Sequence, residues 1–232
     1  MKWWAAKQAA IYAANNLAML SAMKTEAERV DIIKGAPFRK TGDSSDVGNK
    51  VHDWIDTYAK RSIEDNQGKS LPRGAWEPID LAGSVITARR MWNQFVHLAN
   101  HYEMIWLHSE ITVWSDKYEY AGTGDAVVSI NGQVVFTDWK TGNGVYPEVG
   151  MQLAALANAD YALDADGNQF ALPKPDMYAV GHVRPTYTRL SPVANIDSCF
   201  KAFLGLREVH RWQCETEQDV LLYAPKIEGP KL

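Results

Sequence analysis

The stretch from Glu119 to Lys140 reads EYAGTGDAVVSINGQVVFTDWK, and it contains the clearest strand and turn signals in the chain. Two runs rich in β-branched and aromatic residues lie on either side of Asn131-Gly132, the strongest short-range signal for a two-residue β-hairpin. A third run of the same kind, Glu110–Trp114, precedes them. Three such runs in succession predict an antiparallel meander of three strands.

The sequence around the meander has helical spacing of its apolar residues. We expect a loop at 34–46, with Asp46 as the cap of the helix that follows. The helix after the meander is expected to open at Pro147 and Glu148. The expected elements are helices at 3–20, 25–33, from 47 onward, about 81–106, from 147 to 157 and 193–212, and a strand at 176–183. This order predicts an α/β (α+β) fold, in which a central mixed β-sheet with a three-stranded meander is flanked by helices.

The composition bounds the organisation of the chain and its class. A length of 232 residues allows a single domain with a sizeable core, here expected to have a helical N-terminal region (1–46) and a core (47–232). Two cysteines exclude a disulfide framework and a four-cysteine metal site, and no run of about 18 apolar residues or signal-peptide pattern occurs. We therefore expect a cytoplasmic protein that does not enter membranes. The net charge of −4 argues against a protein that coats nucleic acid.

Charged residues on the two hairpin strands carry the most specific chemistry. Asp125 and Asp138 lie at similar distances from the turn, so antiparallel pairing brings them close together. Because side chains alternate along a strand, Lys140 lies on the face of Asp138, whereas Trp139 points away into the core. Two carboxylates and an ammonium fit metal-assisted attack of water on a phosphodiester, with Mg²⁺ or Mn²⁺ as the ion.

The same residues also fit an ordinary Asp–Lys pair beside a hairpin. The glycines nearby favour the functional interpretation, because Gly122, Gly124 and Gly142 would let the backbone approach another group closely.

Gly124-Asp125 followed by Asp138-Trp-Lys140-Thr-Gly142 resembles the Asp…(Asp/Glu)-x-Lys core of the PD-(D/E)xK nuclease superfamily, in the form of its RecB-type and Cas4-like exonuclease branch. Gly48-Asn-Lys-Val-His52 resembles the upstream helix of that branch, which carries a glycine and a metal-binding histidine. Gln152-Leu-Ala-Ala-Leu156 resembles its downstream Gln-x-x-x-Tyr helix, although Leu156 stands where tyrosine is usual. These motifs span about residues 47–157, and the resemblance implies a restriction-endonuclease-like core.

The resemblance also implies roles for individual residues. His52, Asp125, Asp138 and the backbone carbonyl of Trp139 would bind one or two Mg²⁺ or Mn²⁺ ions. Lys140 would act on the water and the transition state. Gln152 would contact the DNA backbone or steady the site, and Glu110 is a secondary acidic candidate. Basic residues expected to line a DNA channel include Lys50, Arg89 and Arg90.

The resemblance leads us to expect a divalent-metal-dependent DNA exonuclease that acts on single-stranded DNA or linear ends, in DNA repair, recombination or phage DNA processing. With two cysteines the chain would hold no iron–sulfur cluster. It has no phosphate-binding loop of a helicase, so a helicase or recombination protein is a possible partner. The alternatives are a structure- or end-processing endonuclease of the same fold and a non-catalytic nucleic-acid-binding module.

Overall fold

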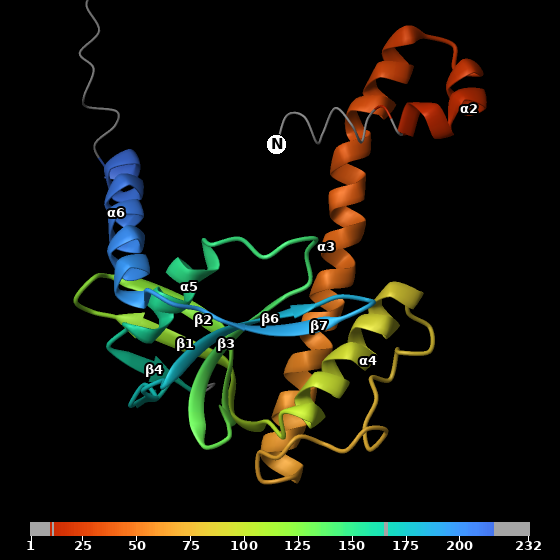
Figure 1. Cartoon of the computed structure of the whole chain (residues 1–232). Helices are drawn as coiled ribbons and strands as arrows, with labels where there is room; N and C mark the ends of the chain where they lie inside the picture. Colours follow the sequence, from red (N-terminus) through yellow and green to blue (C-terminus); the bar gives the residue numbers. More distant parts are fainter. Residues whose placement is uncertain (1–9, 11, 165–166, 216–232) are drawn as a thin grey trace, which may run out of the picture. The chain divides into compact units, whose positions relative to one another are not determined.

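The protein consists of helices and a seven-stranded β-sheet (Figure 1). The computed structural model describes residues 10, 12–164 and 167–215. The sheet has the strand order β5-β4-β1-β2-β3-β6-β7 and is flanked by helices, which confirms the predicted mixture of helices and sheet. The helices are α2 (Leu17–Ser21), α3 (Glu26–Asp65), α4 (Ile86–His101), α5 (Val149–Ala157) and α6 (Ile196–Glu215). The strands are β1 (Ile105–Ser115), β2 (Tyr120–Ile130), β3 (Gln133–Lys140), β4 (Tyr161–Leu163), β5 (Gln169–Phe170), β6 (Met177–Val183) and β7 (Thr188–Pro192).

The chain forms two compact units, and each consists of several segments of the sequence. The first unit comprises Met1–Met104, Trp139–Gly144 and Gly181–Arg189, and the second comprises Ile105–Asp138, Val145–Val180 and Leu190–Leu232. No helix among the described residues is both long enough and apolar enough to cross a membrane.

The predicted hairpin is confirmed. Antiparallel pairs join β2 to β3 from Ile130–Gln133 at the turn to Ala126–Thr137. Asn131 and Gly132 both have left-handed backbone, with φ of 52° and 80°, as a type I′ turn requires. This turn therefore fixes the register of the two strands.

Helix α3 differs from the prediction. It begins at Glu26, after the N-cap Thr25, whose side chain and that of Glu28 form a reciprocal capping box, and it continues without a break to Asp65. The loop expected at 34–46 and the cap expected at Asp46 are therefore wrong. The Gly and Pro residues of this segment disfavour helix locally, but extending an existing helix adds one hydrogen bond per residue, so helical flanks can outweigh them. Of the helix expected at 3–20, residues 1–9 and 11 lie outside the described residues.

Helix α4 is shorter than predicted at both ends. Backbone hydrogen bonds from Leu81 to Pro78 and from Ser84 to Leu81 form turns before it, so the helix begins at Ile86. Glu103, with φ of 47°, turns the chain out of the helix, and Trp106 lies in β1 instead. Strands β4, β5 and β7 were not predicted, because each has at most five residues and no clear alternation.

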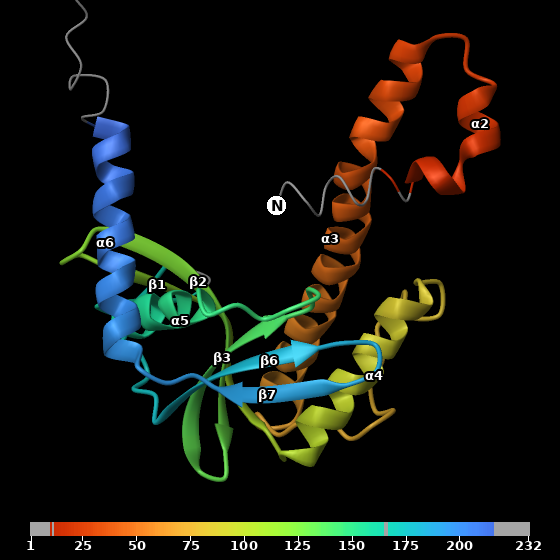
Figure 2. The same cartoon turned by 45° about the horizontal axis from the view of Figure 1, so that its top comes forward.

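An aromatic core holds α3 and α4 side by side in the first unit (Figures 1 and 2). Tyr58 of α3 packs edge-to-face against Trp92 and Phe95 of α4, with ring centroids 5.7 and 5.5 Å apart. Trp139 packs against Phe95 at 5.3 Å and is 1% exposed, so its side chain lies in the core as expected.

The second unit has an aliphatic core between α5 and the strands. Leu153 and Leu156 of α5 pack with Ile111, Val127 and other buried residues of the sheet. In Figures 1 and 2, α6 extends well past the strands of this unit, and none of its residues is buried.

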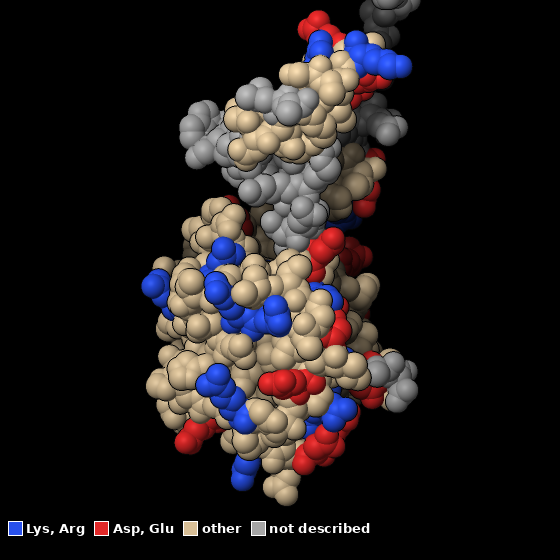
Figure 3. Space-filling model, turned by 90° about the vertical axis from the view of Figure 1, so that its right-hand side faces the viewer, with Lys and Arg blue, Asp and Glu red and all other residues tan. Residues whose placement is uncertain are grey.

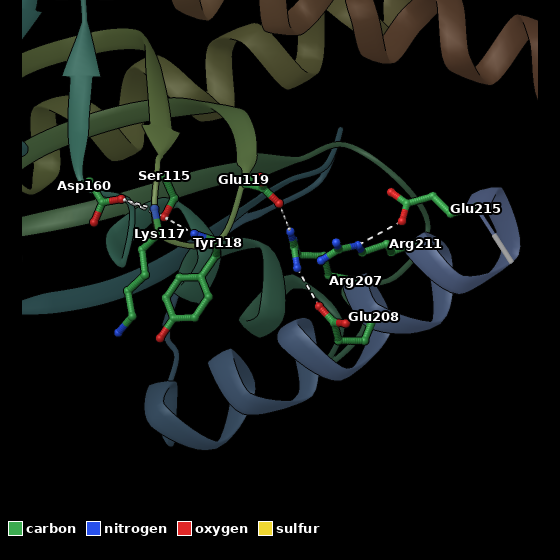
Figure 4. A network of polar contacts seen from close by, with 9 residues as sticks. All are labelled: Ser115, Lys117, Tyr118, Glu119, Asp160, Arg207, Glu208, Arg211 and Glu215. Atoms are coloured by element: carbon green, nitrogen blue, oxygen red, sulfur yellow. Dashed lines mark hydrogen bonds and ion pairs between the residues drawn. The ribbon is translucent and has the colours of Figure 1, made fainter.

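A polar network links the β1–β2 turn to the rest of the second unit (Figure 4). Asp160 accepts hydrogen bonds from the backbone N–H of Lys117 and the hydroxyl of Ser115, each 3.0 Å long. These two bonds lower the pKa of the Asp160 carboxyl, and the bond from the Lys117 backbone has the larger effect. On the other side of the turn, Arg207 of α6 forms an ion pair with Glu119 at 3.2 Å.

Candidate functional site

Three carboxylates lie in a row across β1, β2 and β3, in the second unit. Glu110 falls opposite Asp125, because the pairs on either side are Ser109 with Ala126 and Ile111 with Gly124. The β2–β3 pairs end at Ala126–Thr137, and Asp125 and Asp138 are the next residues on the two strands, where a continued register would set them opposite each other. Residues in such opposed positions have Cβ atoms about 4.5–5.5 Å apart. The observed register thus leads toward Asp125 and Asp138, and their proximity stays a prediction.

The three carboxylates differ in their exposure to water. Asp138 is 1% exposed and is the one buried carboxylate among the described residues, whereas Asp125 is half-buried and Glu110 is exposed. Burying a carboxylate costs free energy unless hydrogen bonds, a counter-charge or a cation compensates it. The buried position of Asp138 therefore requires a compensating group or cation beside it.

Glu110 stands out by its backbone as well as its register. Its φ of 51° is left-handed, although it lies within β1 and is not a glycine. Such a conformation costs of the order of 1–3 kcal/mol and is found preferentially at functional sites. This is a second observation at the row of carboxylates that exceeds what a plain strand requires.

Lys140 lies two residues after Asp138 on the same strand, and its side chain is half-buried. Strand alternation places it on the same face as Asp138, with Trp139 on the opposite face.

His52 lies on α3 in the first unit and is half-buried. Gly48 lies one turn earlier on the same helix. A Cβ atom added at Gly48 would lie 2.7 Å from Oγ1 of Thr141. The absent side chain allows α3 to approach the end of β3, directly after Lys140.

The glycines of β2 serve packing in the same way. A Cβ atom added at Gly124 would lie 3.1 Å from Cδ1 of Leu156 and 3.3 Å from Cγ2 of Ile111, and one at Gly122 would lie 3.0 Å from Cδ2 of Leu156. The close approach expected at these two glycines is confirmed, and the approaching groups are side chains of α5 and β1. Gln152, on the same helix, is exposed.

Two of the three predicted DNA-binding cations have other partners. Lys50 forms an ion pair with Asp80 at 2.5 Å, and Asp80 also accepts a 2.8 Å hydrogen bond from Nε1 of Trp54. The hydrogen bond from Lys50 is the main reason why the pKa of Asp80 is lowered. Arg89 donates to the carbonyl of Ala82 at 3.5 Å, whereas Arg90 is exposed.

The face shown in Figure 3 carries Lys and Arg side chains interspersed with Asp and Glu, without a continuous field of one sign. Binding of a polyanion there would rest on local groups of cations.

Sequence reasoning missed the residues that hold the segment after Lys140. Arg184 donates hydrogen bonds to the carbonyls of Thr141 and Gly142, and Nε2 of His182 bonds to the carbonyl of Gly142 at 2.8 Å. The one available signal was the spacing of His182, on β6, and Arg184, directly after that strand, and it does not reveal which neighbour they face.

The predicted ligands do not form a complete metal cage. Within the described part of the chain, no group of three or more His, Cys, Asp and Glu side chains is arranged to hold a metal ion. The carboxylate pair and Glu110 belong to the second unit, whereas His52 and Lys140 belong to the first.

No model of a protein family matches this chain, and no curated protein is significantly similar to it.

Proposed function

We propose that this protein is a divalent-metal-dependent deoxyribonuclease that hydrolyses DNA phosphodiester bonds from linear ends, with a core of the PD-(D/E)xK type. One observation carries the proposal: the β2–β3 register runs to Ala126–Thr137, so its next step would set Asp125 opposite Asp138, and Lys140 follows Asp138 by two residues. The burial of Asp138 supports it, because a buried carboxylate beside a second carboxylate favours a bound cation.

The residues present fit Mg²⁺ or Mn²⁺ better than an ion that needs a full protein cage. Mg²⁺ is usually held by one or two carboxylates, with water and substrate phosphate at the remaining positions. Asp125 and Asp138 would supply this pair, and His52, the Trp139 carbonyl and Glu110 are further candidate ligands. A bound divalent ion would polarise the phosphate and lower the pKa of the attacking water.

The chain's own groups would then position the reactants and balance charge. The Lys140 ammonium, on the face of Asp138, would stabilise the negative charge that develops on the phosphate. Gln152, exposed on α5, would contact the DNA backbone. Arg90 is the best-placed channel cation, because it is exposed and Lys50 and Arg89 have partners within the protein.

Hydrolysis assays on the full chain test the activity. Linear and covalently closed circular DNA, single- and double-stranded, are incubated with Mg²⁺, Mn²⁺ or a chelator. We expect metal-dependent loss of linear DNA while closed circles stay intact. Cutting of circles would replace the exonuclease by an endonuclease, and tight DNA binding without hydrolysis would indicate a binding module.

Variants test the site itself. Asp125→Asn, Asp138→Asn and Lys140→Met each remove a charge with little change in shape, and each is expected to lower the rate by about 10²-fold or more. Asp116→Asn is the matched control, because Asp116 is an exposed carboxylate on the β1–β2 turn that accepts a hydrogen bond from Trp114. Full activity of the Asp138 or Lys140 variant would rule out the proposed site.

A further inference from the structure

The segment directly after Lys140 is held by a side chain from a distant part of the sequence. Arg184, which follows β6, donates from Nη1 to the carbonyls of Thr141 at 2.6 Å and Gly142 at 2.8 Å. Its Nη2 donates to Oδ1 of Asn143 at 2.9 Å. One guanidinium thus binds three consecutive residues. Its planar fork suits such multiple hydrogen bonding, which an ammonium group does not reproduce.

His182 adds a fourth bond to the same segment. Its Nε2 lies 2.8 Å from the carbonyl of Gly142, and its Nδ1 lies 3.2 Å from the hydroxyl of Tyr187. A neutral imidazole with the proton on Nε2 satisfies both contacts, since Nε2–H donates to the carbonyl and Nδ1 accepts from Tyr187. His182 is 8% exposed, so this arrangement is sheltered from water.

Helix α3 contacts the same segment, because Gly48 lies against the side chain of Thr141. The segment 141–143 is thus held both by side chains at the end of β6 and directly after it, and by the helix that carries His52. Lys140 directly precedes this segment.

We infer that Arg184 is a positioning residue for Lys140. By holding the carbonyls of residues 141 and 142, it sets the direction in which the chain leaves β3 and hence the place of the Lys140 ammonium. This inference rests on the proposed function. A shift of about 1 Å in a catalytic group can cost about 10²-fold in rate, so a bond network of this kind can matter without touching DNA.

Two substitutions and one control test the inference. Arg184→Lys keeps the charge but loses the forked geometry, and Asn143→Ala removes one of the three contacts while leaving Arg184 in place. Arg211→Lys is the control, because Arg211 lies on α6 and pairs with Glu215.

Two readouts do not depend on activity: amide hydrogen exchange in the peptide containing 141–144, and the rate at which the Lys140 amine is acylated relative to Lys117. We expect faster exchange and an altered Lys140 acylation rate in Arg184→Lys, a smaller change of the same kind in Asn143→Ala, and none in Arg211→Lys. Unchanged exchange and acylation in both test variants would overturn the inference, also if the wild-type chain proves inactive on DNA.

Single-turnover hydrolysis then separates positioning from DNA contact. We expect the rate at saturating DNA to fall by about 10–100-fold in Arg184→Lys, while the Kd for DNA and its salt dependence change little. An unchanged rate with weaker DNA binding would show that Arg184 contacts the DNA, and would overturn the positioning role. If the wild type does not hydrolyse DNA while amide hydrogen exchange responds as expected, the proposed function fails. The role of Arg184 in holding residues 141–143 then still stands.

Discussion

Gly48 of α3 lies so close to Thr141 that a Cβ atom at position 48 would be 2.7 Å from the threonine Oγ1. Real Cβ atoms do not make contacts this short. The helix can reach the end of β3 only because residue 48 has no side chain.

Gly48→Ala is therefore expected to lower the free energy of unfolding by about 1–3 kcal/mol through overpacking. This loss exceeds the gain of about 0.5–1 kcal/mol that alanine brings to a helix interior. Chemical denaturation measures the effect. Combining the substitution with Thr141→Ala removes the clashing hydroxyl, so a double-mutant cycle should show a favourable coupling. Additive effects would contradict the contact.

Gly124→Ala tests the packing role of the β2 glycines. The new methyl group would meet Leu156 and Ile111, which are both buried, so we expect a loss of about 1 kcal/mol in stability. Thermal unfolding of this variant, alone and with Leu156→Val, measures the loss and its partial recovery. Unchanged stability with weakened metal or DNA binding would instead indicate that these glycines face a ligand.

Asp160→Asn tests the pH dependence of the β1–β2 turn. The hydrogen bonds from Lys117 and Ser115 lower the pKa of Asp160 in the folded state. The stabilisation is therefore present above the carboxyl's ordinary pKa and is lost as the pH falls through the lowered folded-state value. We expect the wild type to have the higher Tm at pH 7, and the difference to shrink toward about pH 3. Melting curves across this range check it, and a difference independent of pH would show that charge is not involved.

Gly35→Ala tests whether α3 is continuous. In the interior of a helix this change should raise the free energy of unfolding by about 0.5–1 kcal/mol. Gly132→Ala is the contrasting variant, because Gly132 has a φ of 80° and should lose about 1 kcal/mol or more. Circular dichroism and denaturation of both variants decide the matter. Destabilisation by Gly35→Ala would indicate a left-handed loop there.

The sequence predicted those parts of the fold that local chemistry decides. The Asn131-Gly132 turn determines its own type and the register of β2 and β3, so the pairs from Ile130–Gln133 to Ala126–Thr137 followed from counting. The continuity of α3 did not follow, because Gly35 and Pro37 punctuate the sequence strongly while helical flanks act over a longer range.

The remainder of the candidate site depends on contacts between residues far apart in the sequence. Nothing near Thr141 indicates that Arg184, 43 residues later, binds its carbonyl. Nothing near Gly48 in the sequence indicates that Thr141 lies against it.

The two-residue turn at Asn131-Gly132 sets the register of side chains that lie several residues away on β2 and β3. Deleting one of its residues would leave too few to close the hairpin in the present register, so one strand would slip by a position. A slip of one residue turns every side chain of that strand to the opposite face of the sheet, and Asp138 would exchange places with Trp139. Although this tip is exposed, a change of length there would reach the carboxylate pair without altering either aspartate.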